Sequence, residues 1–274
     1  MRFVALSDHA GDMLADARRR RVSAQERAEE RYRRELAAYK DRVAQARERR
    51  ARARKQGGLL SRLWLGLAAL WRGGDEAPPP PLPASLPSDG EAAIAGGVKG
   101  EQEVAVALDA ALDDGWVLVK GYRNRRGEID YLVLGPGGLF AIEVKYVNGT
   151  FRITRDRWRY VKYDNYGNPV EQREIADRGG RPPNVQLTEP LLVLEQFLAS
   201  RGQPVRMRPV VLLSHPKARI DRCAADVGVL VLTSTAQLLR LVLDGEAEIS
   251  GGQLAEIERL VVRDHRFHAR GRRG

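Results

Sequence analysis

Hydrophobic and polar residues follow three different patterns along the chain, and the first of them predicts a long helix. Residues 13–55 are rich in Ala, Arg, Glu and Gln and contain neither Gly nor Pro, a composition that favours a continuous helix. Apolar residues recur in it at intervals of four and three, as in a short coiled-coil seam: Tyr32, Leu36, Tyr39, Val43 and Ala46. We therefore expect residues 1–58 to form a basic helical arm, either solvated or self-associating through this seam.

The second pattern is a short apolar segment followed by a proline-rich stretch. The apolar residues run from Leu59 to Trp71, fewer than the about 20 that a membrane-spanning helix needs. Contact with a membrane surface or with protein is therefore expected for residues 59–72, and no transmembrane span. Residues 73–93 contain the run Pro-Pro-Pro-Pro-Leu-Pro and predict an extended linker.

The third pattern alternates helix and strand signals and predicts an α/β fold. Helical spacing precedes Gly115, and a leucine-rich helix is expected from Thr188, as its N-cap, to Ala199, with Pro190 in its first turn. The expected strands are 116–120, 128–134, 138–145, 150–154, 157–163, 205–213 and 227–232, followed by helices at 237–243 and 253–262. We place one domain at residues 94–200 and expect 201–262 to extend it, although a separate accessory domain is the alternative.

Two of these strands form a predicted hairpin that gathers charged side chains. Residues 135–138 read Gly-Pro-Gly-Gly and predict the turn, so that paired residues have numbers adding to a constant. Asp130 then faces Glu143, and Glu128 faces Lys145, with all four side chains on one face. A bulge near the turn would shift this register, because Pro-Gly suits a type II turn better than the primed turns of tight hairpins.

The facing carboxylates of this hairpin indicate a metal site. Cβ atoms of directly paired residues lie about 5 Å apart, where like charges destabilise a sheet unless they are neutralised. A divalent cation bound by Asp130 and Glu143 would neutralise them and keep positions for water and a phosphate oxygen. The alternative is a surface ion pair between Glu128 and Lys145, which leaves the facing acids unexplained.

The motifs Gly-Glu-Ile-Asp at 127–130 and Ile-Glu-Val-Lys at 142–145 resemble the nuclease-related domain (NERD) family of the PD-(D/E)XK nuclease superfamily. The resemblance implies a restriction-endonuclease-like mixed sheet flanked by helices. It also implies that Asp130 and Glu143 bind Mg²⁺ or Mn²⁺, and that Lys145 positions or activates water and stabilises charge at phosphorus.

Two further segments extend this resemblance to supporting residues. Gly100-Glu101 is similar to the start of the family's first helix, so that Glu101 rather than Glu103 is the expected supporting carboxylate. Residues 183–186 look like the family's Pro-x-x-Gln segment, which makes Gln186 a candidate polar contact to the site. Pro190 departs from that pattern and leaves open whether Gln186 lies inside or outside the helix.

The net charge of +10 is concentrated at the two ends of the chain. Residues 1–55 carry +8 and residues 263–274, an expected basic tail, carry +4, whereas residues 56–262 carry −2. Attraction to nucleic acid phosphates is therefore expected from the ends, and in the arm from Arg18, Arg19, Arg20 and Arg21. Anionic lipid and plain solvation are the alternatives for these arginines.

The single cysteine and the N-terminal sequence bear on the compartment. Cys223 has no partner for an internal disulfide, which fits a reducing environment, and we expect it to be buried. Residues 1–13 include Asp8 and Asp12 and lack the continuous apolar core of a secretory signal. A cytoplasmic location is therefore expected.

Two functions from different classes follow from the sequence. The first is a metal-dependent nuclease that hydrolyses phosphodiester bonds, with DNA favoured over RNA as substrate. The second is a non-catalytic binding or scaffolding module that reuses the same fold and acts through its basic helical arm. Metal binding by Asp130 and Glu143 distinguishes the two.

Overall fold

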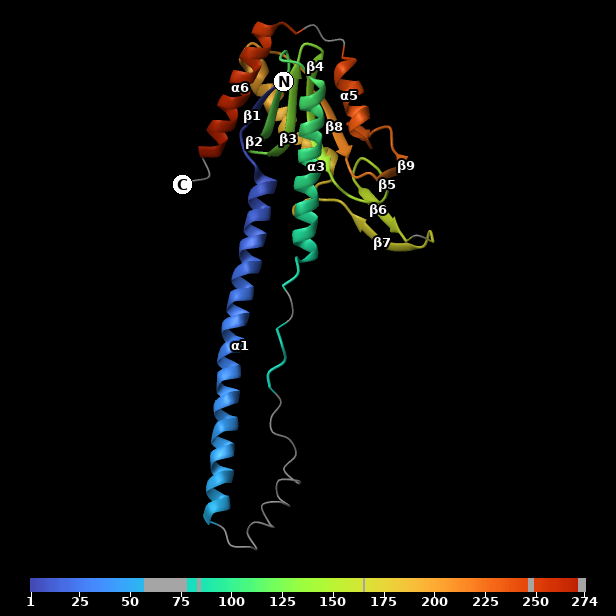
Figure 1. Cartoon of the computed structure of the whole chain (residues 1–274). Coiled ribbons are helices and arrows are strands. Elements are labelled where there is room, and N and C mark those ends of the chain that lie inside the picture. The colour runs from blue at the N-terminus through green and yellow to red at the C-terminus, as the bar shows by residue number, and fades with distance from the viewer. Residues whose placement is uncertain (57–77, 83–84, 165, 246–248, 271–274) are drawn as a thin grey trace. The chain divides into compact units, whose positions relative to one another are not determined.

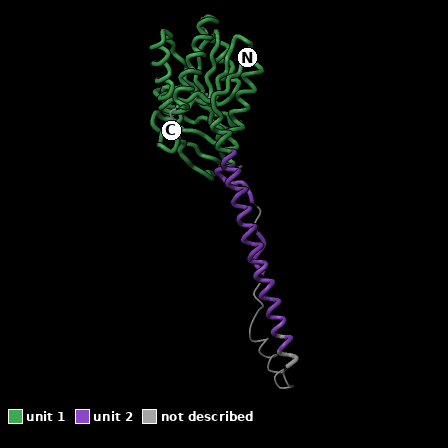
Figure 2. The backbone as a smooth tube through the Cα atoms, turned by 90° about the vertical axis from the view of Figure 1, so that its left-hand side faces the viewer, with its two compact units in different colours: residues 1–14, 92–274 green, residues 15–91 purple. Residues whose placement is uncertain are grey.

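The computed structural model describes residues 1–56, 78–82, 85–164, 166–245 and 249–270 (Figure 1). The chain divides into two compact units: unit 1 comprises Met1–Leu14 and Ala92–Gly274, and unit 2 comprises Ala15–Glu91 (Figure 2). The apolar segment from Leu59 to Trp71 and most of the expected linker lie outside the described residues. No helix in the described ranges combines the length and apolar character needed to cross a membrane.

Unit 2 is built mainly from the long helix α1 (His9–Gln56), whose first residues belong to unit 1. Ion pairs one turn apart, such as Glu30 with Arg34, lie on its exposed surface and stabilise the helix. Near its start, Arg21 Nε donates to Glu91 Oε2 (3.0 Å) and Arg21 Nη1 to the Ser85 carbonyl (3.2 Å). Arg21 is thus bound within unit 2, which lowers its availability for phosphate.

Unit 1 contains a six-stranded mixed sheet in the order β1-β2-β3-β4-β8-β10. Its strands are β1 (Arg2–Ala5), β2 (Val117–Asn124), β3 (Gly127–Gly135), β4 (Gly138–Lys145), β8 (Arg208–Leu213) and β10 (Leu230–Leu232). The β2-β3-β4 meander is antiparallel, whereas β1 with β2, β4 with β8 and β8 with β10 are parallel. The expected mixed sheet flanked by helices is confirmed. Its edge strand β1 comes from residues that the sequence analysis assigned to the arm.

Helices cover both faces of this sheet (Figure 1). One face packs against α3 (Asp89–Ala111) and α5 (Thr235–Leu243) through Leu108 and Val242. The other packs against α4 (Pro183–Ser200) and α6 (Gly251–Arg270) through Leu194 and Ile257. Because both faces are covered, the central strands are apolar on both sides, as the burial of residues 131–135 shows.

A smaller second sheet lies beside the first in the order β7-β6-β5-β9. Its strands are β5 (Thr150–Ile153), β6 (Trp158–Tyr163), β7 (Pro169–Glu174) and β9 (Arg219–Cys223). Trp158 and Phe151 bury their rings in the same core as α4, and Trp158 Nε1 donates to Asn184 Oδ1 (2.9 Å). Cys223 is exposed on β9, so its expected burial is wrong.

Several expected boundaries are also wrong, and in each case tertiary contacts decide. Residues 1–14 belong to unit 1 rather than to one arm of 1–58, because β1 pairs with β2. The tail expected at 263–274 is helical to Arg270, with Asp264 and His265 buried. Helix α4 begins at Pro183 with Pro182 as its N-cap, so Thr188 is not the cap and Gln186 lies inside the helix. Residues 201–262 supply β8 and β10 to the main sheet of unit 1.

Gly121 changes the side to which residues of β2 and β3 point. It has a φ of 71°, and a Cβ atom there would overlap the Ser7 carbonyl oxygen. In the register of the two strands it lies opposite Asp130. Tyr131 packs in the core beside α3, whereas Ile129 packs in the opposite core, although regular alternation would put both on one face. The regular alternation of side chains along β3 is therefore broken between Ile129 and Tyr131.

Substitution of Gly121 should be more destabilising than substitution of a glycine with the same backbone conformation in open space. Gly121→Ala combines left-handed strain with the overlap at Ser7, so the free energy of unfolding should fall by about 2 kcal/mol or more. Gly202 has a φ of 79° and no atom within 4 Å of its Cβ position, so Gly202→Ala should lose only about 1 kcal/mol. Equal losses in chemical denaturation would show that the Ser7 contact is unimportant.

Candidate active site

The β3–β4 hairpin brings the principal candidate residues to one end of the main sheet. Its register runs from Gly135 paired with Gly138 to Tyr131 paired with Ile142, so the predicted constant sum is confirmed for these five pairs. The pairing stops before Asp130 and Glu143, where β4 continues alongside β8. The two acids therefore lie where the strands part, not as a regular cross-strand pair.

Asp130 occupies the gap between the parting strands. Its Oδ2 atom accepts a hydrogen bond from the Val144 amide (2.7 Å), replacing the backbone acceptor that a continued ladder would provide. The side chain is thereby fixed against β4, between the positions of Glu143 and Lys145. A sequence argument from alternation alone brings Asp130 near Glu143 but does not predict this hydrogen bond.

Lys145 joins Glu143 to helix α4. Its Nζ atom donates to Glu143 Oε1 (2.5 Å) and to Gln186 Oε1 (3.0 Å). Glu143 is 6% exposed, and the Gln186 amide nitrogen donates in turn to the Arg181 carbonyl (2.6 Å). The structure thus brings Glu143, Lys145 and Gln186 together, as expected from the sequence.

Glu101 approaches the same cluster from α3. Lys120 Nζ on β2 lies 3.7 Å from Glu101 Oε2 and 2.7 Å from Asp8 Oδ1, at the start of α1. The Tyr131 hydroxyl donates to the Glu101 carbonyl (3.0 Å) and fixes this part of α3 against β3. Lys120 and Asp8 were missed by the sequence reasoning, because their proximity depends on β1 pairing with β2.

Glu128 does not contact Lys145, so this expectation is wrong. Its carboxylate forms an ion pair with Arg123 and lies 2.9 Å from Ser7 Oγ. The change of direction at Gly121 and Asp130 accounts for the difference, since Glu128 precedes Asp130 on β3 and lies on the other side of this break from the β3–β4 turn. Glu128 is therefore a neighbour of the site on the β2 side.

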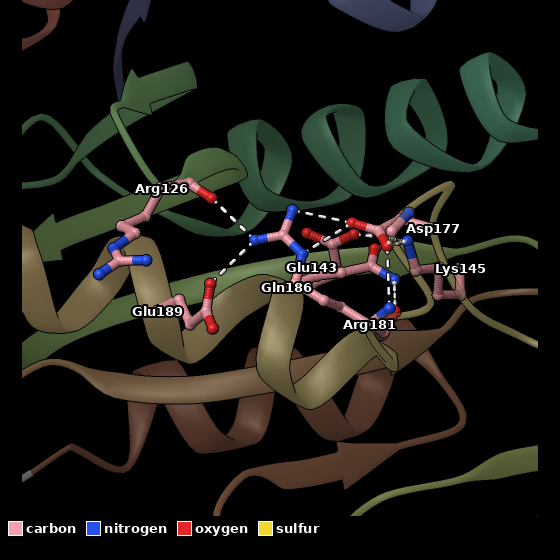
Figure 3. A network of polar contacts seen from close by, with 8 residues as sticks. Arg126, Glu143, Lys145, Asp177, Arg181, Gln186 and Glu189 are labelled. Carbon is pink, nitrogen blue, oxygen red and sulfur yellow. Dashed lines mark hydrogen bonds and ion pairs between the residues drawn. The ribbon is translucent and has the colours of Figure 1, made fainter.

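A second layer of polar contacts holds Gln186 in place (Figure 3). Arg181 binds Asp177 Oδ2 (2.8 Å), Glu189 Oε2 (2.9 Å) and the Arg126 carbonyl (2.8 Å). Asp177 Oδ1 also accepts the Gly179 and Arg181 amides, each at 2.9 Å, which closes the turn before α4. The sequence signal for this turn is Asp-Arg-Gly-Gly, a typical pattern for an aspartate-capped turn that was overlooked.

Burial and neighbouring charges shift the pKa values of three groups in this cluster, Asp130, Glu101 and Lys145. Burial, with the nearby Glu143 and Glu101 carboxylates, raises the pKa of Asp130 well above its usual value. Burial also raises the pKa of Glu101 to about 7, against the opposing effect of the Lys120 ammonium. Burial acts to lower the pKa of Lys145, but Glu143 and Asp130 outweigh it and raise that pKa, so the ammonium stays charged at neutral pH.

Asp130 and Glu143 are the residues that could hold a metal ion. Their oxygens are the ligands that Mg²⁺ and Mn²⁺ prefer, and a cation would offset both the burial and the carboxylate repulsion that raise the pKa of Asp130. Within the described ranges, no group of three or more His, Cys, Asp or Glu side chains is arranged to hold a metal. Mg²⁺ bound by two carboxylates keeps several coordination positions for water or substrate oxygens.

The arginines of the arm that are expected to bind nucleic acid lie on α1. Arg18, Arg19, Arg20 and Arg21 all belong to unit 2, where Arg19 pairs with Asp16 and Arg21 with Glu91. Their contact with nucleic acid stays a prediction. The apolar seam lies along α1 in the same unit, and its self-association stays a prediction too.

Comparison with known proteins identifies one matching family. Residues 96–214 match the family described as the nuclease-related domain, which confirms the resemblance drawn from the sequence. The match runs from α3 to just beyond β8 and contains the cluster described above except Asp8. No curated protein and no solved structure matches the chain.

The raised pKa of Glu101 predicts a pH dependence of stability in metal-free protein. With a folded pKa of about 7 against an ordinary 4.5, the folded protein holds a proton that the unfolded chain releases, so the free energy of unfolding falls as pH rises between these values. In EDTA, the free energy of unfolding of Glu101→Gln should therefore rise relative to that of the wild type as the pH rises. The difference between the two proteins should be roughly 1 to 3 kcal/mol more favourable to the variant at about pH 8 than at about pH 4.

The exposed Glu103 provides the control, since it lies on the same helix and pairs only with Lys99 among the described residues. In denaturant titrations, the free energy of unfolding of Glu103→Gln should differ from that of the wild type by the same amount at both pH values. A pH-independent effect of Glu101→Gln would contradict the raised pKa.

Proposed function

We propose that the protein is a metal-dependent nuclease that hydrolyses phosphodiester bonds, with DNA as the favoured substrate. The match of residues 96–214 to the nuclease-related domain family supports this proposal. The single observation that supports this most is the placing of Asp130 beside Glu143 and Lys145 by its hydrogen bond to the Val144 amide. Two acids and one ammonium group then meet at one end of the sheet, a set of groups suited to phosphodiester chemistry.

In this proposal Asp130 and Glu143 hold Mg²⁺ or Mn²⁺. Such an ion, when bound, supplies a water of lowered pKa and offsets negative charge on the phosphate. Glu101 supports the acidic cluster, and Lys120 limits its net charge from the side of β2. The raised pKa of Asp130 describes the metal-free state, in which a proton is the competing occupant of the carboxylate pair.

Lys145 acts as a positioned hydrogen-bond donor rather than as a base. Its raised pKa keeps it protonated at neutral pH, and an ammonium group has three N–H donors. Two of these are engaged by Glu143 and Gln186, which leaves one for a water or for a phosphate oxygen. Gln186 is held through the Arg181 carbonyl, so α4 sets the direction of the ammonium group.

Metal binding is the first test of the proposal. Calorimetry should show that the wild type binds Mg²⁺ and Mn²⁺ and that Asp130→Asn does not, because one of the two carboxylates is lost. In EDTA the same variant should be at least as stable as the wild type, since it relieves repulsion with Glu143 and Glu101. A wild type that binds neither ion would favour the scaffolding alternative.

Cleavage is the second test. Lys145→Met should retain metal binding but lose about 100-fold or more in the rate of cleavage, as expected when a donor to developing charge is removed. Labelled single-stranded and duplex DNA and RNA, with and without Mg²⁺, provide the measurement. Lys162→Met is the matched control, because Lys162 pairs with Glu171 (2.6 Å) in the second sheet. Undiminished cleavage by Lys145→Met would exclude the assigned role.

A further inference from the structure

A groove rich in arginine lies in unit 1, between α6 and the turn that joins β2 to β3. It encloses about 1380 Å³ and is lined by seven arginines but by one acidic residue, Glu258. Arg123 comes from the end of β2, Arg125 from the turn that follows it, and Arg2 from β1. None of the residues assigned to the proposed catalysis lines this groove.

Four of these arginines form a stripe along α6. Arg259, Arg263, Arg266 and Arg270 are spaced by four, three and four residues, which places them on one side of the helix over about 16 Å. The opposite side of α6 is buried against the sheet through Leu254, Ile257, Leu260 and Val261. The stripe is thus fixed by the core rather than carried on a free tail.

Most of the positive charge in the groove is not neutralised by the protein. Arg2 pairs with Glu258, Arg123 with Glu128, and Arg259 with Glu256. The four remaining arginines of the lining are exposed: Arg125, Arg263, Arg266 and Arg270. Within the described ranges, no hydrogen bond or ion pair engages the side chains of these four residues. Like charges held this close favour a polyanionic ligand.

An exposed aromatic ring lies among these arginines. Phe267 lines the groove and is 74% exposed, next to Arg266 on α6. Grooves that bind single-stranded nucleic acid combine cationic side chains along the phosphates with aromatic rings that stack on bases. An unpaired base can reach such a ring, whereas the bases of a duplex are already stacked on their neighbours.

A short turn connects this groove to the proposed active site. Arg125 lines the groove, and the carbonyl of the next residue, Arg126, accepts the hydrogen bond from Arg181 that supports Gln186 (Figure 3). Asn124 fixes this turn, because its side chain accepts from the Arg126 amide (2.9 Å) and donates to the Pro190 carbonyl (2.8 Å) on α4.

Buried hydrogen bonds also fix α6 to this turn. The Tyr122 hydroxyl donates to Asp264 Oδ2 (2.5 Å) and accepts from the Asn124 amide nitrogen (3.2 Å). Burial and the Asp264 carboxylate raise the pKa of Tyr122, so its hydroxyl stays protonated and keeps donating. Hydrogen bonds therefore connect α6, the β2–β3 turn and the residues that support the proposed active site.

We propose that this groove holds a nucleic acid strand beside the active site, with phosphates on the α6 arginines and an unpaired base stacked on Phe267. The proposal rests on the proposed function, which it refines by assigning substrates with a single-stranded segment. The requirement for a single-stranded segment distinguishes this proposal from general electrostatic attraction of nucleic acid to the basic ends of the chain.

The charge of the groove is tested by binding of a labelled single-stranded oligonucleotide to the full chain in EDTA, which prevents cleavage. The triple variant Arg263→Gln, Arg266→Gln and Arg270→Gln should bind about tenfold more weakly near physiological salt, and the slope of log affinity against log salt should fall by about 2. The triple variant Arg201→Gln, Arg222→Gln and Arg240→Gln makes the same charge change on exposed residues outside the groove and should change binding less than about twofold. Equal losses in the two triple variants, or none in the first, would overturn the proposal.

The aromatic contact is tested by Phe267→Leu, which keeps an apolar side chain on an exposed position. Single-strand binding should weaken by about tenfold with an unchanged salt slope, whereas duplex binding should stay the same. Leu243→Ala, at a position 54% exposed on α5, is the apolar control and should leave both unchanged. Wild-type affinity of Phe267→Leu for the single strand would overturn the base contact.

Cleavage assays with Mg²⁺ on the same proteins separate this proposal from the proposed function. If the wild type cleaves and the groove triple variant binds and cleaves as well as the wild type, the groove proposal fails and the nuclease proposal stands. If the wild type binds the strand through the groove but cleaves nothing with either metal, the nuclease proposal fails and the groove remains a binding surface.

Discussion

The hydrogen bond from the Val144 amide to the Asp130 carboxylate determines the geometry of the whole site. Where β3 leaves β4, an amide donor on β4 needs an acceptor, and the Asp130 side chain provides it. Since Glu143 and Lys145 flank that amide on the same strand, one bond fixes the separation of all three groups. The backbone conformation of Gly121 opposite Asp130 makes this departure from regular pairing sterically feasible.

The arrangement concentrates more negative charge than the protein itself neutralises. Glu101, Asp130 and Glu143 converge from three elements, and the lysines that balance them are Lys120 on β2 and Lys145 on β4. Burial and, after it, this excess of negative charge raise the pKa values of Asp130 and Glu101, which gives both groups a preference for protons in the metal-free protein. A local conflict of this kind within a well-packed sheet is what functional sites commonly show, because ligand binding resolves it.

The sequence was sufficient to predict interactions that depend on short stretches of chain. The Gly-Pro-Gly-Gly turn and the alternation of apolar residues give the correct hairpin register, and with it the proximity of Asp130, Glu143 and Lys145. The position of Glu128 could not be predicted, because it depends on the conformation of Gly121, which packs against Ser7 from a distant part of the sequence. Likewise, the start of α4 depends on Asp177 and Arg181 closing a turn, and this places Gln186 within reach of Lys145.

Net charge misled the sequence interpretation for a related physical reason. Residues 56–262 carry −2 and residues 263–274 carry +4, which suggested a neutral domain with a basic tail. The buried face of α6 extends to Asp264 and His265, so the core holds the arginines that follow these residues in fixed positions along the helix. A sum over sequence segments cannot reveal such an arrangement, because the field at a groove depends on where charges lie in space. The charges of Arg263, Arg266 and Arg270, which the sequence assigns to an end of the chain, therefore belong to the surface of the folded unit, beside the turn that supports the candidate active site.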